Sequence, residues 1–133
     1  MAEFVMKDLV KNTNLDIIIE SAATSTEALG CRVHRGTREI LGRYGISTDG
    51  KYAIQMTKAD YDKYDYIIGM DSLNIRNIHR ITGGDPDGKI YKLLEFDGSL
   101  EDIADPWYTD NFELTYEGVV RGCKALLKKI SGV

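Results

Sequence analysis

A continuous apolar run at residues 66–70 gives the clearest indication of the fold. Such a run indicates a strand that is covered on both faces, as in the parallel sheets of α/β proteins. From Ser72 onward, apolar side chains recur at helical spacing until the Gly83-Gly84-Asp85-Pro86 sequence stops the pattern. A buried strand followed by an amphipathic helix therefore predicts a βα unit, with Asp71 at the end of the strand.

The rest of the chain continues this alternation of strand and helix patterns. Further strands are expected at residues 15–19 and 90–96, and helices at 2–11, 36–44 and from the Asp110 cap to about residue 130, with a short helix capped by Thr57. The alternation predicts a three-layer α/β fold, in which a parallel sheet carries helices on both faces. Ligands bind such sheets beyond the carboxyl ends of the strands, so Ser21, Asp71 and the loop around Asp105 are expected to gather there.

Composition sets the broad class. With 133 residues, of which 43% are hydrophobic, residues 1–133 can form a single domain around one core. The net charge is −4 and the basic residues are scattered, which argues against a nucleic-acid partner. Cys31 and Cys123 lie far apart and show no metal spacing, so we expect reduced cysteines, no metal and no cofactor. Neither a leader nor an apolar run of membrane-spanning length is visible, which predicts a cytoplasmic protein that does not enter the membrane.

A proline turn at residues 104–110 carries the most distinctive chemistry. Pro106 fixes its own φ and favours an extended conformation for Asp105, which would present the carboxylate outward beside Trp107 and Tyr108. A positioned carboxyl group next to an aromatic wall suits a general acid. The alternative is an ordinary surface turn whose two aromatic residues fold back onto the core, and the spacing alone favours that interpretation.

Several segments, taken together and in this order, resemble the low-molecular-weight protein-tyrosine phosphatases: residues 1–5, 21–25, 65–71 and 105–108. The resemblance implies hydrolysis of a phosphoric monoester through a phosphocysteine, with a phosphotyrosine protein or a small phosphoester as substrate. It assigns Asp105 as the acid that protonates the leaving phenolate and later activates water. The other positions it implies are Trp107 and Tyr108 as the aromatic wall, Glu27 on the opposite rim, Ser21 as support for the phosphate loop and Asp71 behind the site.

The sequence also departs from the family pattern at its start. The family begins with a strand and a phosphate loop of the form Cys-x5-Arg before the first helix, whereas this chain begins where that loop should end. Cys31 is followed six positions later by Thr37, and Cys123 lies on the apolar stripe of the last helix. We therefore expect an N-terminally truncated relative that lacks its first, central strand and has no phosphatase activity alone.

Loss of a central strand would leave two sheet edges with unpaired backbone groups. We expect something to fill or close this gap, and a homodimer or a strand-swapped oligomer is one solution. Two other functions remain open at this point. One is a non-catalytic pseudophosphatase that acts as a protein-binding module. The weaker one is an arsenate reductase of the same fold, which would need further redox cysteines after residue 70 that the sequence does not contain there.

Overall fold

A computed structural model describes residues 1–24, 35–48, 50, 54–103 and 111–132 of the chain. The elements in this part follow one another in the order α1 (Ala2–Val10), α2 (Arg35–Arg43), α3 (Asp60–Lys63), β1 (Ile67–Gly69), α4 (Ser72–Thr82), β2 (Ile90–Lys92), the 3-10 helix η1 (Leu93–Asp97) and α6 (Phe112–Ser131).

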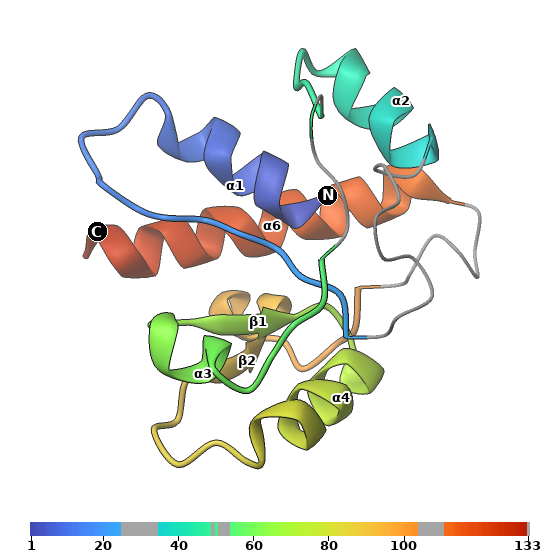
Figure 1. The fold of residues 1–133 in the computed structure, drawn as a ribbon. Coiled ribbons are helices and arrows are strands. Elements are labelled where there is room, and N and C mark those ends of the chain that lie inside the picture. The colour runs from blue at the N-terminus through green and yellow to red at the C-terminus, as the bar shows by residue number, and fades with distance from the viewer. Residues whose placement is uncertain (25–34, 49, 51–53, 104–110, 133) are drawn as a thin grey trace.

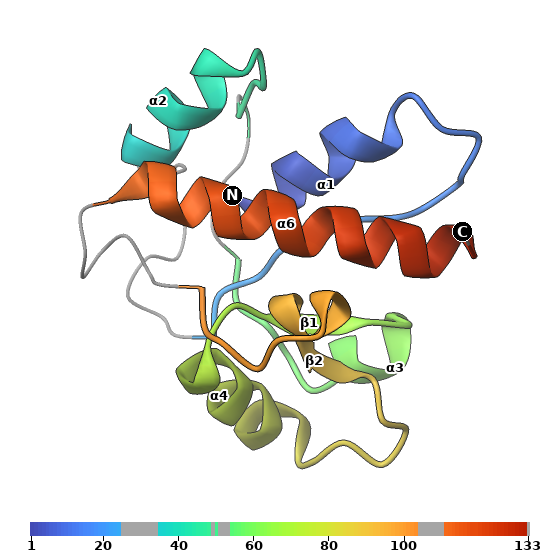
Figure 2. The ribbon, with the colours of Figure 1, turned by 180° about the vertical axis from the view of Figure 1, so that it is seen from behind.

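The elements form layers around a small sheet. Strands β1 and β2 lie in the middle, with α1, α2 and α6 on one side and α3 and α4 on the other (Figures 1 and 2). The strands pair in parallel, with Ile67 opposite Ile90 and Gly69 opposite Lys92. The βα unit predicted from the apolar run is confirmed, and so are helices on both faces of a parallel sheet.

Two groups of buried residues hold these layers together. The larger core lies mainly between α1, α2, η1 and α6, and the smaller one joins α3, β1 and α4. The larger comprises Val5, Met6, Val10, Ile40, Leu41, Leu93, Leu94, Ile103, Val119, Cys123 and Leu126, and the smaller Met56, Tyr61, Ile67 and Ile78. On the side of the smaller core, Gly69 lets α4 approach the strand, because an added Cβ would lie 2.9 Å from Asn74 Cβ.

Helix boundaries follow local sequence signals, with small corrections. Gly83 ends α4 at a φ of 80°, as its position in the sequence predicts. The cap of α6 is Asn111, whose side chain accepts from the N–H of Leu114, rather than the predicted Asp110, which lies outside the described residues. Thr57 was expected to cap a short helix, but α3 begins only at Asp60, whose carboxylate accepts from the N–H of Thr57 at 2.9 Å.

The predicted strand at residues 15–19 is wrong for this structure. Residues 15–19 are not part of a strand, and an isolated parallel bridge forms later in the chain, between Ala23 and Gln55. Within the described residues, the sheet has two strands only. Apolar, β-branched residues favour an extended chain, but a strand exists only where a neighbour accepts its backbone hydrogen bonds. The missing central strand itself stays a prediction.

The predicted strand at residues 90–96 is also corrected. It ends at Lys92, and the chain turns directly into η1, which Gly98 closes at a φ of 77°. Leu93 and Leu94 are both buried, at 1% and 4% exposure. Leu93 packs against α6 at Gly122, where a Cβ added to the glycine would lie 2.4 Å from Cγ of Leu93. Packing of consecutive leucines against the core therefore replaces the second half of the strand.

Candidate active site

Ser21 is tied to the first turn of α1. Its hydroxyl donates a hydrogen bond to Oε1 of Glu3 at 2.9 Å, and Oε2 of the same carboxylate lies 3.1 Å from the ammonium of Lys7. Glu3 is buried, at 6% exposure, and the ion pair with Lys7 offsets the cost of burying its charge. The serine that the resemblance assigns to phosphate-loop support thus lies beside the N-terminal turn of α1.

Asp71 lies at the junction between β1 and α4. It is the N-cap of α4, because its Oδ1 accepts from the N–H of Asn74 at 2.7 Å. Asn74 in turn accepts from the N–H of Met70 at 3.0 Å through its side-chain oxygen. These two bonds fix the turn between the strand and the helix, and Asp71 is the residue that caps the start of α4.

The residues just before the proline turn meet the same junction. The N–H of Ile103 donates to the carbonyl of Met70 at 2.9 Å, and Ile103 is buried. Oδ1 of Asp102 accepts from both the N–H and the hydroxyl of Ser72, each at 3.1 Å. The ammonium of Lys92, 2.8 Å away, and the two donors of Ser72 hold the pKa of the Asp102 carboxyl below its usual range, although burial opposes this.

Three stretches therefore end at one corner of the molecule. The chain at residues 20–24, the β1–α4 junction and the stretch that ends at residue 103 lie near one another in both views (Figures 1 and 2). This is the carboxyl end of β1, where ligand sites of parallel sheets form. Ser21 and Asp71 thus reach the predicted end of the sheet, whereas four other predicted site residues lie outside the described residues: Glu27, Asp105, Trp107 and Tyr108.

Cys123 is buried in the larger core, as its place on the apolar stripe predicts. It is 1% exposed, and its thiol faces the carbonyl of Ala2 at 3.9 Å. Burial raises the pKa of the Cys123 thiol to about 12. A nucleophilic cysteine must be a thiolate that its substrate can reach. Cys123 therefore does not serve as a phosphatase nucleophile, and Cys31 lies outside the described residues.

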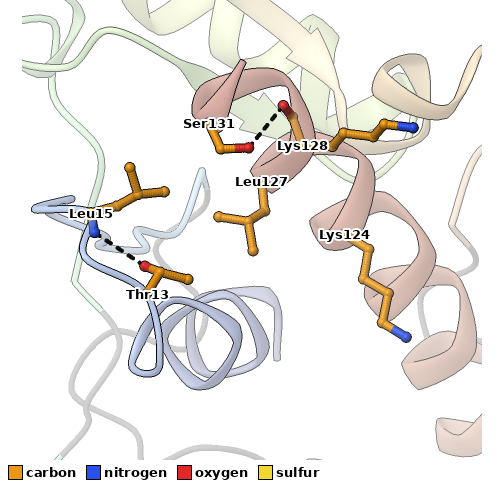
Figure 3. Close-up of a pocket in the computed structure, with 6 residues that line it drawn as sticks. All are labelled: Thr13, Leu15, Lys124, Leu127, Lys128 and Ser131. Atoms are coloured by element: carbon orange, nitrogen blue, oxygen red, sulfur yellow. Dashed lines mark hydrogen bonds between the residues drawn. The ribbon is translucent and has the colours of Figure 1, made fainter. Parts of the chain in front are cut away.

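A hollow of about 410 Å³ lies between the loop after α1 and the C-terminal half of α6. Leu15 and Leu127 lie across from each other in it, while the ammonium groups of Lys124 and Lys128 point away (Figure 3). A ligand site needs a few polar groups that converge on the ligand. The hydroxyl groups of Thr13 and Ser131 in the lining donate to the nearby backbone carbonyls of Val10 and Lys128. The corner at the carboxyl end of β1 is therefore the better candidate.

Comparison with known proteins identifies the family. The sequence profile described as "Low molecular weight phosphotyrosine protein phosphatase" matches residues 1–132. The chain belongs to this family. It is 40% identical to "Low molecular weight protein-tyrosine-phosphatase YfkJ" of Bacillus subtilis in an alignment 134 residues long. The alignment covers 98% of this chain and 86% of that protein. It is 39% identical to "Low molecular weight protein-tyrosine-phosphatase PtpA" of Staphylococcus aureus, over 98% of this chain and 84% of that protein.

Solved structures agree with the family assignment. The crystal structure of YfkJ superposes with a TM-score of 0.93 at 38% identity, and covers 98% of this chain and 85% of that chain. The structure of SP-PTP from Streptococcus pyogenes gives a TM-score of 0.84 at 43% identity, with 96% and 81% covered. The phosphatase-like α/β fold predicted from the resemblance is therefore confirmed. No helix in the described part of this family member combines the length and apolar character needed to span a membrane.

Two residues of this corner were missed by reasoning from the sequence. Glu3 and Asp102 each hold a junction together, and neither was singled out, because isolated acidic residues on a helix or in a loop resemble ordinary surface charges. A signal was present for Glu3, which lies in the first turn of α1, where a carboxylate favours the helix. Asp102 offered no local signal, since its partners lie 10 and 30 residues away in the sequence.

Proposed function

We propose that these 133 residues provide the acid side of a low-molecular-weight phosphatase site and do not hydrolyse phosphoesters by themselves. The family match over residues 1–132 supports the reaction class. The proposed lack of activity rests on the two cysteines, neither of which fits the role of the nucleophile. Cys123 is buried with a raised pKa, and Cys31 is followed by threonine, not arginine, at the sixth position.

In the proposed reaction, Asp105 in its protonated form donates its proton to the phenolate oxygen as the phosphorus–oxygen bond breaks. The resulting carboxylate then takes a proton from the water that attacks the phosphoenzyme. Trp107 and Tyr108 flank the aromatic ring of a phosphotyrosine, and Glu27 lies on the opposite rim. Ser21 and Asp71 act indirectly, by fixing the loop beside α1 and the start of α4.

The phosphoryl group needs an acceptor that this sequence does not contain. A phosphocysteine forms when a thiolate attacks phosphorus while an arginine and backbone N–H groups bind the phosphoryl oxygens. No Cys-x5-Arg segment occurs in the 133 residues. Asp105 can therefore complete a turnover only together with a nucleophile loop from outside this sequence.

The test is hydrolysis of an aryl phosphate such as p-nitrophenyl phosphate by the purified chain, whose length is verified by intact mass. We expect the unmodified chain to hydrolyse the aryl phosphate no faster than the Asp105→Ala variant does. The control is Asp87→Ala, which changes an exposed carboxylate in the loop between α4 and β2. Turnover that Asp105→Ala abolishes and Asp87→Ala leaves intact would contradict the proposed inactivity, while it would support Asp105 as the acid.

We also propose that the chain associates with a second copy. In a parallel ladder, alternate residues direct their backbone groups to opposite edges. Ile67 donates toward β2, to the carbonyl of Lys89, so the backbone of Ile68 faces the opposite edge of β1. The residues at 16–19 have no backbone hydrogen bond within the described chain, and Ile18 is 78% exposed. An open strand edge and an unpaired extended segment in one molecule can pair reciprocally between two copies.

A further inference from the structure

The carboxylate of Asp102 joins three segments that are far apart in the sequence. Its Oδ1 accepts hydrogen bonds from the N–H and the hydroxyl of Ser72 at the start of α4, each at 3.1 Å. The ammonium of Lys92, the last residue of β2, lies 2.8 Å from the same oxygen and also donates to the carbonyl of Leu100 at 3.0 Å. One oxygen atom thus links α4, β2 and residues 100–102.

The next residue strengthens this link. Ile103 donates its N–H to the carbonyl of Met70 and buries its side chain, at 4% exposure. Two consecutive residues are therefore bonded to the two sides of the β1–α4 junction. Bonds at successive positions fix both the location and the direction of the chain.

The contacts of Asp102 are not explained by a contribution to overall stability alone. The Asp102 side chain is 45% exposed, and exposed ion pairs contribute little to stability. The bonds from Ser72 differ, because the N–H belongs to the first turn of a helix, where a carboxylate meets a free donor and the positive end of the helix dipole. These bonds also hold residue 102 against the start of α4.

We infer that Asp102 is a positioning residue for the phosphatase acid: it fixes the point at which the chain enters the segment that carries Asp105. The inference rests on the proposed function, because that function makes Asp105 the acid. Asp102 acts through the backbone and needs no contact with substrate. Placement of a catalytic group matters, since a misplacement of about 1 Å can lower a rate about 100-fold.

The single tryptophan of the chain allows a direct test. Trp107 lies two residues after Asp105, so its fluorescence reports on that segment without any need for turnover. We expect Asp102→Ala to lower the fluorescence anisotropy of Trp107 and to raise its quenching by acrylamide, with the far-ultraviolet circular dichroism unchanged. Asp102→Asn keeps an oxygen that accepts from Ser72, and we expect it to restore most of the anisotropy.

The matched control is Asp97→Ala. Asp97 lies five residues earlier and pairs with Arg121 of α6, and within the described part of the chain it has no side-chain bond to α4. We expect this variant to leave the anisotropy and quenching of Trp107 at their wild-type values. Equal changes in both alanine variants would indicate general loosening and would overturn the inference, as would a folded Asp102→Ala variant with unchanged Trp107 signals.

If Asp102→Ala does not fold, a milder substitution at Lys92 tests the same inference. Lys92→Met removes the ammonium and leaves the bonds from Ser72 to Asp102, so we expect a smaller change of the Trp107 signals in the same direction. No change in this folded variant would then overturn the inference. The fluorescence results are independent of the aryl phosphate assay, so failure of one proposal is distinguishable from failure of the other.

Discussion

At the scale of single residues, Gly122 shows how tightly α6 packs on its neighbour. An added Cβ would lie 2.4 Å from Cγ and 3.0 Å from Cδ2 of Leu93, which is 1% exposed. We expect Gly122→Ala to lower the free energy of unfolding by about 1–3 kcal/mol, as overpacking of a core does. Unfolding in urea, followed by circular dichroism, measures this change.

Gly42→Ala is the matched control for this prediction. Gly42 lies inside α2, and an added Cβ there would meet no atom within 4 Å. Alanine favours a helix interior over glycine, so this variant should gain about 0.5–1 kcal/mol. Equal effects of the two substitutions would show that α6 and η1 do not approach each other as closely as described.

At the scale of elements, one carboxylate organises the loop between α4 and β2. Asp85 accepts from the hydroxyl of Tyr61 at 2.7 Å and from the N–H groups of Lys89 and Ile90 at 2.9 and 3.2 Å. Burial raises the pKa of Asp85, but these donors and the nearby His79 outweigh it and hold the pKa below the ordinary value of 3.8. The loop is thus fixed to α3 on one side and to β2 on the other.

The lowered pKa of Asp85 predicts a dependence of stability on pH. A carboxyl group whose pKa is lower in the folded state contributes stability above its unfolded pKa and loses it as the pH falls through the folded pKa. We expect Asp85→Asn to lower the free energy of unfolding by about 1 kcal/mol at neutral pH, with the difference shrinking below about pH 4. Urea unfolding across this pH range measures the difference.

Asp87→Asn serves as the control for the pH experiment. Its carboxylate lies 4.0 Å from the ammonium of Lys89 and is 64% exposed, so the substitution should change stability little at any pH. A difference between Asp85→Asn and the wild type that stays constant down to acid pH would contradict the role given to the Asp85 charge.

At the scale of the whole molecule, the proposed association makes a concentration-dependent prediction. Light scattering at micromolar concentration should give a mass above the 14.9 kDa of the monomer. We expect Ile18→Lys to restore the monomer, because a charge at an exposed position of the unpaired segment opposes strand pairing. Leu100→Lys is the matched control, since Leu100 is 76% exposed and Ile18 is 78% exposed. A monomeric wild type, or equal effects of the two lysines, would contradict the proposed pairing.

The features that rest on local interactions could be predicted from the sequence. The pattern after Ser72 predicts α4 with its Gly83 stop, the apolar run predicts β1, and the stripe through Val119, Cys123 and Leu126 predicts the buried face of α6. Helix hydrogen bonds join residues four apart, and amphipathic spacing follows from the helix itself, so neighbouring residues carry enough information. The family resemblance, read from motifs in one order, was equally available in the sequence.

The features that depend on distant partners could be seen only in the folded molecule. Residues 15–19 have the composition of a strand, yet they form none, because pairing depends on a neighbouring strand. Leu93 and Leu94 leave the predicted strand for η1 because α6 offers a packing surface. Ser21 bonds to Glu3, 18 residues away, and Asp102 bonds to Ser72, 30 residues away. Such contacts follow from how the elements pack, and no local pattern encodes them.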